Sequence, residues 1–181
     1  MKEKELEEVC LQKKLVFDGK ILQVYCDDVR CPNGNQSTRE VVRHCEASAI
    51  LAFHQGKILL ERQFRYPFQE VLYEIPAGKI DAGEDPLTCA QRELEEETGY
   101  RAKTMKYLGK IYPCVGYSDE VIHLFLADDL EKGKQHLDEN ELVLVEEFSL
   151  QEVLEMVKKG QIPDAKSICA LQYYLLQEGE K

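Results

Sequence analysis

The sequence predicts a mixed α/β sandwich. Three observations support this class: most periodic segments alternate as strands do, one helix with clear boundary signals lies near the middle of the chain, and two further helices follow near its end. Strands are predicted at residues 15–17, 21–30, 37–43, 47–53, 58–64, 71–74, 106–112, 121–126 and 142–148. Helices are predicted at residues 86–98, 150–159 and 163–177.

Two turns organise the first part of the chain. Asn33-Gly34 is a strong hairpin signal between the second and third predicted strands, and Gly56 lies in the turn of a second hairpin. We expect residues 1–44 to form a small antiparallel β subdomain and residues 45–181 to form the main domain. Because open strand edges bind other strands, the subdomain is a candidate dimerisation element.

Composition sets the broad class of the protein. The 181 residues, 44% hydrophobic and 31% charged, suffice for a buried core. No apolar run approaches the roughly 20 residues of a membrane helix, and residues 1–14 lack the apolar stretch of a signal peptide, so we expect a cytoplasmic protein that does not bind membranes. The seven cysteines are odd in number and form no Cys-x-x-Cys pair, which favours small buried residues over disulfides or a zinc site.

Negative charge is concentrated in one segment. The formal net charge is −11, which argues against nucleic acid as a partner, since nucleic-acid-binding proteins usually present a basic surface. Residues 78–100 contain seven acidic and two basic residues, and therefore contribute −5 of this total. Such a segment either forms a solvated surface or binds cations.

The central helix places three carboxylates on one side. Asp85 and Pro86 are good N-cap and first residues, and a glycine ends the helix. Glu93, Glu96 and Glu97 are spaced i, i+3 and i+4, so their side chains share one stripe. Like charges at this spacing repel each other, whereas Mg²⁺ accepts carboxylate and phosphate oxygens together. The alternative for the helix alone is an acidic face that only contacts water.

The residues around this helix resemble the Nudix box, Gly-x5-Glu-x7-Arg-Glu-aliphatic-x-Glu-Glu-x-Gly-aliphatic. The chain matches every charged and glycine position of the pattern: Gly78, Glu84, Arg92, Glu93, Glu96, Glu97 and Gly99. Tyr100 departs from the final aliphatic position but keeps an apolar ring. The resemblance implies a Nudix-type α/β/α sandwich with a mixed sheet.

The resemblance also implies roles for the box residues. Glu93 and Glu97 are expected to bind Mg²⁺ directly, or Mn²⁺ in its place, with the backbone carbonyl of Ala77 as a further ligand. Glu96 is expected to bind the metal directly or through water. Arg92 would orient the glutamates by ion pairing. Glu84 would hold the preceding loop, while Gly78 and Gly99 would stand where a side chain does not fit.

Segments outside the box resemble the ADP-ribose pyrophosphatase branch of the family. Together they extend the resemblance over nearly the whole chain from about Leu15. The matching segments are residues 39–44, 63–67, 73–81, 112–120 and 162–166.

These segments supply candidates for substrate binding and proton transfer. Arg65 is expected to bind a phosphate or the terminal ribose, and Arg39 to reach the substrate either within its own subunit or across a dimer interface. Glu74 would hydrogen-bond the adenine or ribose, and Gly116 lies in a loop expected to contact the substrate. Glu120, on the same loop, is the candidate general base. Each charged residue also has a structural alternative, as a surface arginine or a turn carboxylate.

The expected function is Mg²⁺-dependent hydrolysis of the pyrophosphate bond of ADP-ribose, to AMP and ribose 5-phosphate, or of a related nucleoside diphosphate sugar. One alternative is another substrate, such as GDP-mannose or a dinucleotide. Another is a non-catalytic module that senses ADP-ribose, which predicts an eroded box or an added DNA-binding segment. The box is intact. The resemblance further implies a homodimer whose subunits share the substrate site.

Overall fold

The computed structural model describes residues 3–137, 139 and 141–179. The chain divides into two compact units. One contains the described part of Met1–Cys45 together with Tyr112–Glu120, and the other contains the described parts of Glu46–Ile111 and Val121–Lys181. We describe each unit by itself.

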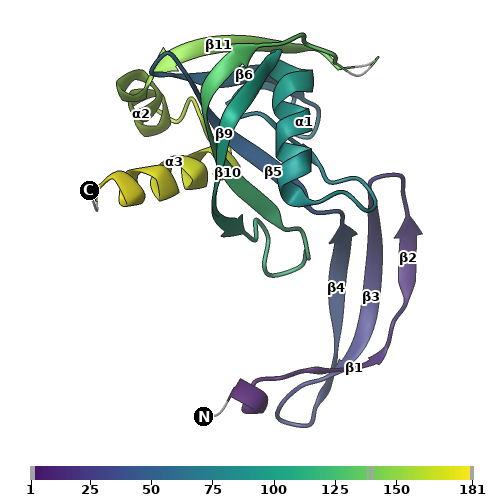
Figure 1. Ribbon diagram of the computed structural model, residues 1–181. Coiled ribbons are helices and arrows are strands. Elements are labelled where there is room, and N and C mark those ends of the chain that lie inside the picture. Colours follow the sequence, from purple (N-terminus) through teal and green to yellow (C-terminus); the bar gives the residue numbers. More distant parts are fainter. Residues whose placement is uncertain (1–2, 138, 140, 180–181) are drawn as a thin grey trace. The chain divides into compact units, whose positions relative to one another are not determined.

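Strands predominate in the chain (Figure 1). They are β1 (Val9–Gln12), β2 (Leu15–Asp18), β3 (Leu22–Arg30), β4 (Gln36–His44), β5 (Ala47–His54), β6 (Lys57–Arg65), β7 (Glu70–Glu74), β8 (Ala77–Lys79), β9 (Tyr100–Ile111), β10 (Ile122–Lys132) and β11 (Val143–Ser149). The helices are α1 (Pro86–Thr98), α2 (Leu150–Lys158) and α3 (Ala165–Glu178), with a 3-10 turn at Glu3–Glu5.

The N-terminal unit is an antiparallel sheet built on β3. Strand β4 pairs along the whole of β3, while β1 pairs with the end of β3 near Arg30 and β2 with the part near Tyr25. The segment 112–120 joins β4, where the Val42 amide donates to the Tyr117 carbonyl over 2.7 Å. All residues of β1 and β2 are exposed, apolar ones included.

The second unit contains a seven-stranded mixed sheet. Its order is β11-β6-β5-β10-β9, with β7 also paired to β6 and β8 to β5. Strands β5 and β10 run parallel, and the other pairs are antiparallel. Strand β8 carries Ala77 and Gly78 beside the buried strand β5, so pairing within the sheet fixes the start of the box.

Helices cover both faces of this sheet, with α1 on one face and α2 and α3 on the other (Figure 1). Ile50 of β5 packs with Leu94 of α1, whereas the next residue, Leu51, packs in the cluster that includes Val153 of α2 and Leu171 of α3. Alternate side chains of one strand therefore enter opposite layers, which is why residues 49–53 of β5 are all apolar. The predicted α/β/α sandwich with an additional antiparallel sheet is confirmed.

Several predicted boundaries were wrong. Strand β9 begins at Tyr100 rather than residue 106, because Gly99 (φ 74°) ends α1 in a left-handed conformation and the chain turns directly into the strand. Helix α3 begins at Ala165 rather than residue 163, because Asp164 caps it by accepting the Ser167 amide over 3.0 Å. Strands β1 and β8 were not predicted, and β10 extends to Lys132 rather than ending at 126.

The expectation that the cysteines are buried was also wrong for most of them. Cys89 is fully buried, whereas Cys10 and Cys45 are exposed and the remaining four are intermediate. In the part of the chain that the structure describes, no helix is both long and apolar enough to cross a membrane.

Candidate active site

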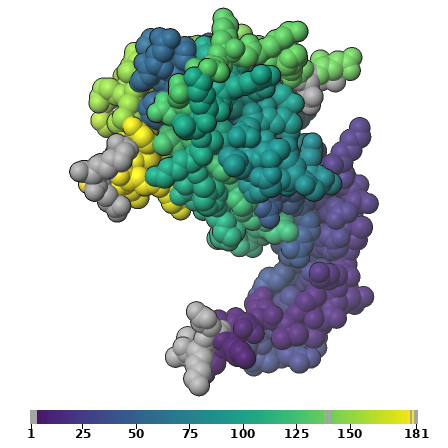
Figure 2. All heavy atoms as spheres, viewed as in Figure 1, coloured from purple at the N-terminus to yellow at the C-terminus, as the bar shows by residue number. Residues whose placement is uncertain are grey.

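Helix α1 has the boundaries that its sequence predicts. The Asp85 side chain accepts the amides of Leu87 and Thr88 over 3.0 and 3.1 Å, and Pro86 is the first helical residue. The amide of Gly99 closes the helix on the Glu95 carbonyl. Leu94 and Ala90 are buried against the sheet, which fixes the rotation of the helix and therefore the direction of its glutamates. Figure 2 shows the region of α1, in teal, at the surface of the molecule.

Gly78 allows the Glu93 carboxyl group to lie against the backbone of β8. A Cβ atom built on Gly78 would overlap the carboxyl atoms of Glu93. Any side chain at this position would therefore displace Glu93. The requirement for glycine here comes from close approach rather than from backbone conformation, since its φ is not in the left-handed region.

Glu97 is buried, at 6% exposure, and is held by the loop that precedes the box. Its Oε2 atom accepts the amide of Ala77 over 2.9 Å. This contact places Glu97 beside the backbone of Ala77, which the sequence predicts as a metal ligand. Glu97 and Glu93 therefore do not point into bulk solvent.

Arg92 joins three carboxylates of the box. Its Nε and Nη2 atoms donate to both oxygens of Glu84 at 2.9 Å, and its Nη1 atom donates to Glu93 at 2.7 Å and to Glu96 at 2.9 Å. Glu84 also accepts the amide of Asp81 over 3.0 Å, so it ties the loop to the helix. These are the contacts expected for a positioning arginine and a loop-holding glutamate.

Glu61 and Glu141 also belong to this acidic region, and sequence reasoning missed both. Glu61 lies on β6, is 4% exposed, and contacts the carboxyl group of Glu97. Glu141, just before β11, is close enough for its charge to act on Glu61, Glu93 and Glu97. A charged residue inside the predicted strand 58–64 was the available signal for Glu61, because buried charges are rare without a function or a partner.

The electrostatics of the cluster disfavour its full ionisation. Burial, followed by the charges of Glu61 and Glu93, raises the pKa of Glu97. Burial, followed by the charge of Glu141, raises the pKa of Glu61. Burial also raises the pKa of Glu93 in spite of its hydrogen bond from Arg92. By contrast, the hydrogen bond from Arg92 lowers the pKa of Glu84.

This set of groups fits a hard divalent cation. All its side-chain donors are carboxylate oxygens, which Mg²⁺ and Mn²⁺ prefer. Arg92 is bound to Glu84, Glu93 and Glu96, and among the described residues no Lys or Arg forms an ion pair with Glu61 or Glu97. Among the described residues, no three His, Cys, Asp or Glu side chains converge on one point, because Arg92 holds Glu93 and Glu96 while the Ala77 amide holds Glu97.

A second charged cluster lies beside this one. Glu74 of β7 is 4% exposed, and its two oxygens accept Nε and Nη2 of Arg65 at 2.6 and 2.8 Å. The Lys166 ammonium also contacts Glu74 and lies 3.1 Å from Asp164. Both oxygens of Glu74 are thus occupied by protein groups. The guanidinium of Arg65 is partly exposed, at 38% for the side chain.

The remaining predicted residues belong to the N-terminal unit. Arg39 of β4 binds Glu8 through its guanidinium and donates to the Thr38 carbonyl over 2.7 Å. Glu120 is partly buried, with Oε1 3.6 Å from Nδ1 of His44. A Cβ atom at Gly116 would meet no atom of the described residues within 4 Å, so packing against these residues does not require a glycine here.

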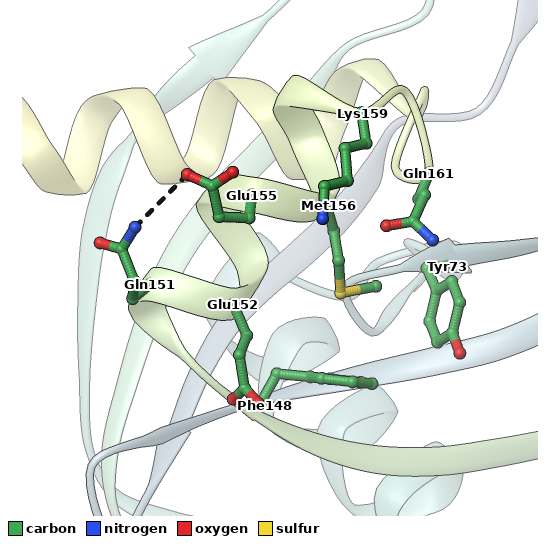
Figure 3. Close-up of a pocket in the computed structure, with 8 residues that line it drawn as sticks. All are labelled: Tyr73, Phe148, Gln151, Glu152, Glu155, Met156, Lys159 and Gln161. Carbon is green, nitrogen blue, oxygen red and sulfur yellow. Dashed lines mark hydrogen bonds between the residues drawn. The ribbon is translucent and has the colours of Figure 1, made fainter.

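The sheet unit also has a pocket of about 470 Å³ beside α2 (Figure 3). It is lined by Tyr73, Phe148, Gln151, Glu152, Glu155, Met156, Lys159 and Gln161. Figure 3 shows the hydrogen bond between Gln151 and Glu155, and Glu155 is also paired with Lys158 over 2.7 Å. The predicted site residues do not line this pocket, so it does not contribute to the site described above.

The fold and the intact box define a class of hydrolase, and comparison with known proteins gives its family. Residues 42–171 match the NUDIX domain, and residues 8–42 match the nucleoside diphosphate sugar hydrolase N-terminal domain. The chain belongs to the Nudix hydrolase family.

Two relatives resemble the chain over almost their whole length. An ADP-ribose pyrophosphatase of Bacillus subtilis is 44% identical over 178 residues, 97% of this chain and 96% of the relative. A methanol dehydrogenase activator of Bacillus methanolicus is 42% identical with the same coverage. A crystal structure of an ADP compounds hydrolase matches with a TM-score of 0.88 over 97% of both chains at 23% identity, and so shows the same fold.

Proposed function

We propose that this enzyme hydrolyses the pyrophosphate bond of ADP-ribose in the presence of Mg²⁺, giving AMP and ribose 5-phosphate. The observation that carries the proposal is the buried, incompletely compensated carboxylate cluster on α1 and β6 of a Nudix protein. The near full-length similarity to an ADP-ribose pyrophosphatase supports the choice of substrate.

Glu93, Glu96, Glu97 and the Ala77 carbonyl are the groups that would hold the metal. When bound, Mg²⁺ would neutralise charge on the diphosphate oxygens and make the attacking water more acidic. Mn²⁺ has similar ligand preferences and is expected to substitute. Arg92 keeps Glu93 and Glu96 close together through its two 2.7–2.9 Å contacts, and Glu84 keeps Arg92 in place.

Arg65 is the proposed substrate-binding residue of the sheet unit. Glu74 fixes the guanidinium plane through two hydrogen bonds, so that the exposed part of Arg65 can bind a phosphate or ribose in a defined orientation. Glu74 thus serves the substrate through Arg65. Arg39 and Gly116 are proposed to contact the substrate from the N-terminal unit, and Arg39 would first have to exchange Glu8 for the ligand.

Proton transfer has two candidate bases. The first candidate is Glu120, proposed from the sequence, which would accept the proton of the attacking water. Glu141 is the second candidate, because its charge acts on Glu61, Glu93 and Glu97. The variants Glu120→Gln and Glu141→Gln distinguish the two candidates. The variant that lacks the general base should lose the acidic limb of the pH–rate profile, whereas the other variant should keep the wild-type profile.

The N-terminal unit, residues 1–44 in our proposal, serves homodimer formation. Its strands β1 and β2 expose apolar side chains, among them Val16 at 67% and Phe17 at 56%. Exposed apolar patches of this kind commonly mark interfaces. Light scattering should give the mass of two chains for the wild type and of one chain for Phe17→Glu; two chains for both would contradict the role of this surface.

A substrate panel tests the proposed activity. ADP-ribose, GDP-mannose and NADH are each incubated with the enzyme and Mg²⁺, and nucleoside monophosphate is measured. The highest kcat/KM should be for ADP-ribose. Higher kcat/KM for GDP-mannose or NADH would assign the alternative substrate. Absence of turnover for all three would support the sensing alternative. The panel is needed because the two relatives of similar identity carry different functional names.

A further inference from the structure

Glu61 has no counterion of its own among the described residues. It lies in the middle of β6 after three fully buried apolar residues, Ile58, Leu59 and Leu60, and is itself 4% exposed. Its Oε1 atom is buried and has no hydrogen-bond partner among the residues that the structure describes. An unpaired carboxylate oxygen in the interior is unfavourable unless a cation or a hydrogen-bond donor binds it.

The surrounding cations are already used by other acids. Arg65 and Lys166 lie near Glu74, which is directly opposite Glu61 on the neighbouring strand, but both bind the carboxylate of Glu74. Arg92 is bound to Glu84, Glu93 and Glu96. The charge of Lys166 acts on Glu61, but none of these cations forms an ion pair with Glu61 in the described part of the chain.

The group that Glu61 does contact is another carboxylate. Its carboxyl group lies against that of Glu97, whose Oε2 atom is held by the Ala77 amide at 2.9 Å. Two adjacent buried carboxyl groups require either a shared proton or a shared cation. Glu93 of α1 and Glu141, just before β11, are close enough for their charges to act on Glu97, which favours a divalent cation.

We propose that Glu61 is an additional carboxylate of the divalent-cation site, so that the site extends from helix α1 onto strand β6. This inference rests on the proposed metal-binding role of the box. It assigns to the sheet a ligand that the box pattern does not contain. Glu61 would bind the cation directly or through one water, and its buried Oε1 atom would thereby gain its missing partner.

Titration with Mn²⁺ alone tests this assignment without substrate. Calorimetry is carried out on metal-free wild type, Glu61→Gln, Glu97→Gln and the control Glu131→Gln, which removes an exposed carboxylate of β10 that is paired with Lys103 of β9. Glu61→Gln should raise the Kd for Mn²⁺ about tenfold or more, the equivalent of about 1.4 kcal/mol. Glu131→Gln should change it by less than about twofold, as expected for a screened surface charge.

The outcomes separate this inference from the proposal on which it rests. A wild-type Kd in Glu97→Gln would contradict the metal site as a whole. A weakened Kd in Glu97→Gln together with a wild-type Kd in Glu61→Gln would overturn the role of Glu61 and indicate a shared proton instead. If Glu61→Gln does not fold, Glu61→Asp decides: weaker Mn²⁺ binding by that variant supports the assignment, and wild-type binding overturns it.

Discussion

Glu61 and Glu74 face each other across strands β6 and β7, and each is only 4% exposed, yet their surroundings are opposite. Glu74 is bound by Arg65 and Lys166, and these contacts outweigh burial, so its pKa is lowered. Glu61 contacts Glu97, is paired with no cation among the described residues, and has its pKa raised by burial. Equal burial on the same sheet has produced one stabilised and one uncompensated carboxylate.

The difference indicates different purposes for the two acids. A buried ion pair that is complete within the protein fixes structure, here the link between β6, β7 and the beginning of α3. A buried acid that the protein leaves incomplete is typical of a site that receives a ligand. The comparison therefore separates a scaffold, Glu74, from a metal-binding region, Glu61 and Glu97, within one pair of strands.

The largest effect is expected in the proposed metal-binding region, on catalytic activity. Glu97→Gln should lower kcat/KM for ADP-ribose by at least about 10²–10³, because it removes a carboxylate that holds the metal against the diphosphate. Steady-state assays of AMP release measure this. Glu131→Gln is the control and should remain within about twofold of the wild type. Near wild-type activity in Glu97→Gln would contradict the proposed metal site.

For Glu74, whose ion pairs are complete within the protein, the expected effect of substitution is a loss of stability. Glu74→Gln leaves Arg65 and buried Lys166 without their carboxylate, which should lower the free energy of unfolding by about 3 kcal/mol, the lower end for a broken buried pair because Arg65 is 38% exposed. Urea unfolding monitored by circular dichroism measures it. A change below about 1 kcal/mol would show that Glu74 is not the scaffold described here.

The ion pairs of Glu74 with Arg65 and Lys166 should make the stability of the protein depend on pH. The pKa of Glu74 is lowered in the folded state, so its stabilising contribution is complete above the unfolded value of about 4.3 and is lost as the pH falls through the lower folded value. The difference in unfolding free energy between wild type and Glu74→Gln should therefore be largest near neutral pH and shrink in acid. A constant difference would contradict this assignment.

The smallest effect is expected for Glu61 in the absence of metal. In EDTA, Glu61→Gln should unfold within about 1 kcal/mol of the wild type, or be slightly more stable, because the amide keeps the shape of the side chain without an unpaired charge. Thermal melts of both proteins in EDTA give this comparison. A loss as large as that of Glu74→Gln would mean that Glu61 has a structural partner and would remove the contrast between the two acids.

Helix α1 shows what can be predicted from sequence. Its beginning at Pro86 and its end at Thr98 follow from Asp85 and Gly99, whose effects act over one turn of chain. The contacts of Arg92 with Glu96 and Glu93 are equally local, since these residues follow it by four positions or fewer. Local chemistry therefore predicted the helix and its stripe of glutamates, whereas the ion-pairing role of Arg92 came from the resemblance to the Nudix box.

The contribution of the sheet was not predictable in the same way. Glu61 is buried because β6, β7 and α1 assemble around it, and its neighbours in sequence do not show this. Likewise, the occupation of Glu74 by Lys166 joins residues 92 positions apart. Strand β8 was missed because only its pairing with β5 makes three residues a strand. These features depend on tertiary contacts between distant segments.

The most direct test of the account is a Mg²⁺ titration of metal-free enzyme with ADP-ribose as substrate and both products measured. We predict no AMP above background in EDTA, and AMP and ribose 5-phosphate in equal amounts as Mg²⁺ is restored. Hydrolysis at the same rate in EDTA and in Mg²⁺ would contradict the claim that the carboxylates of α1 act by holding a divalent cation.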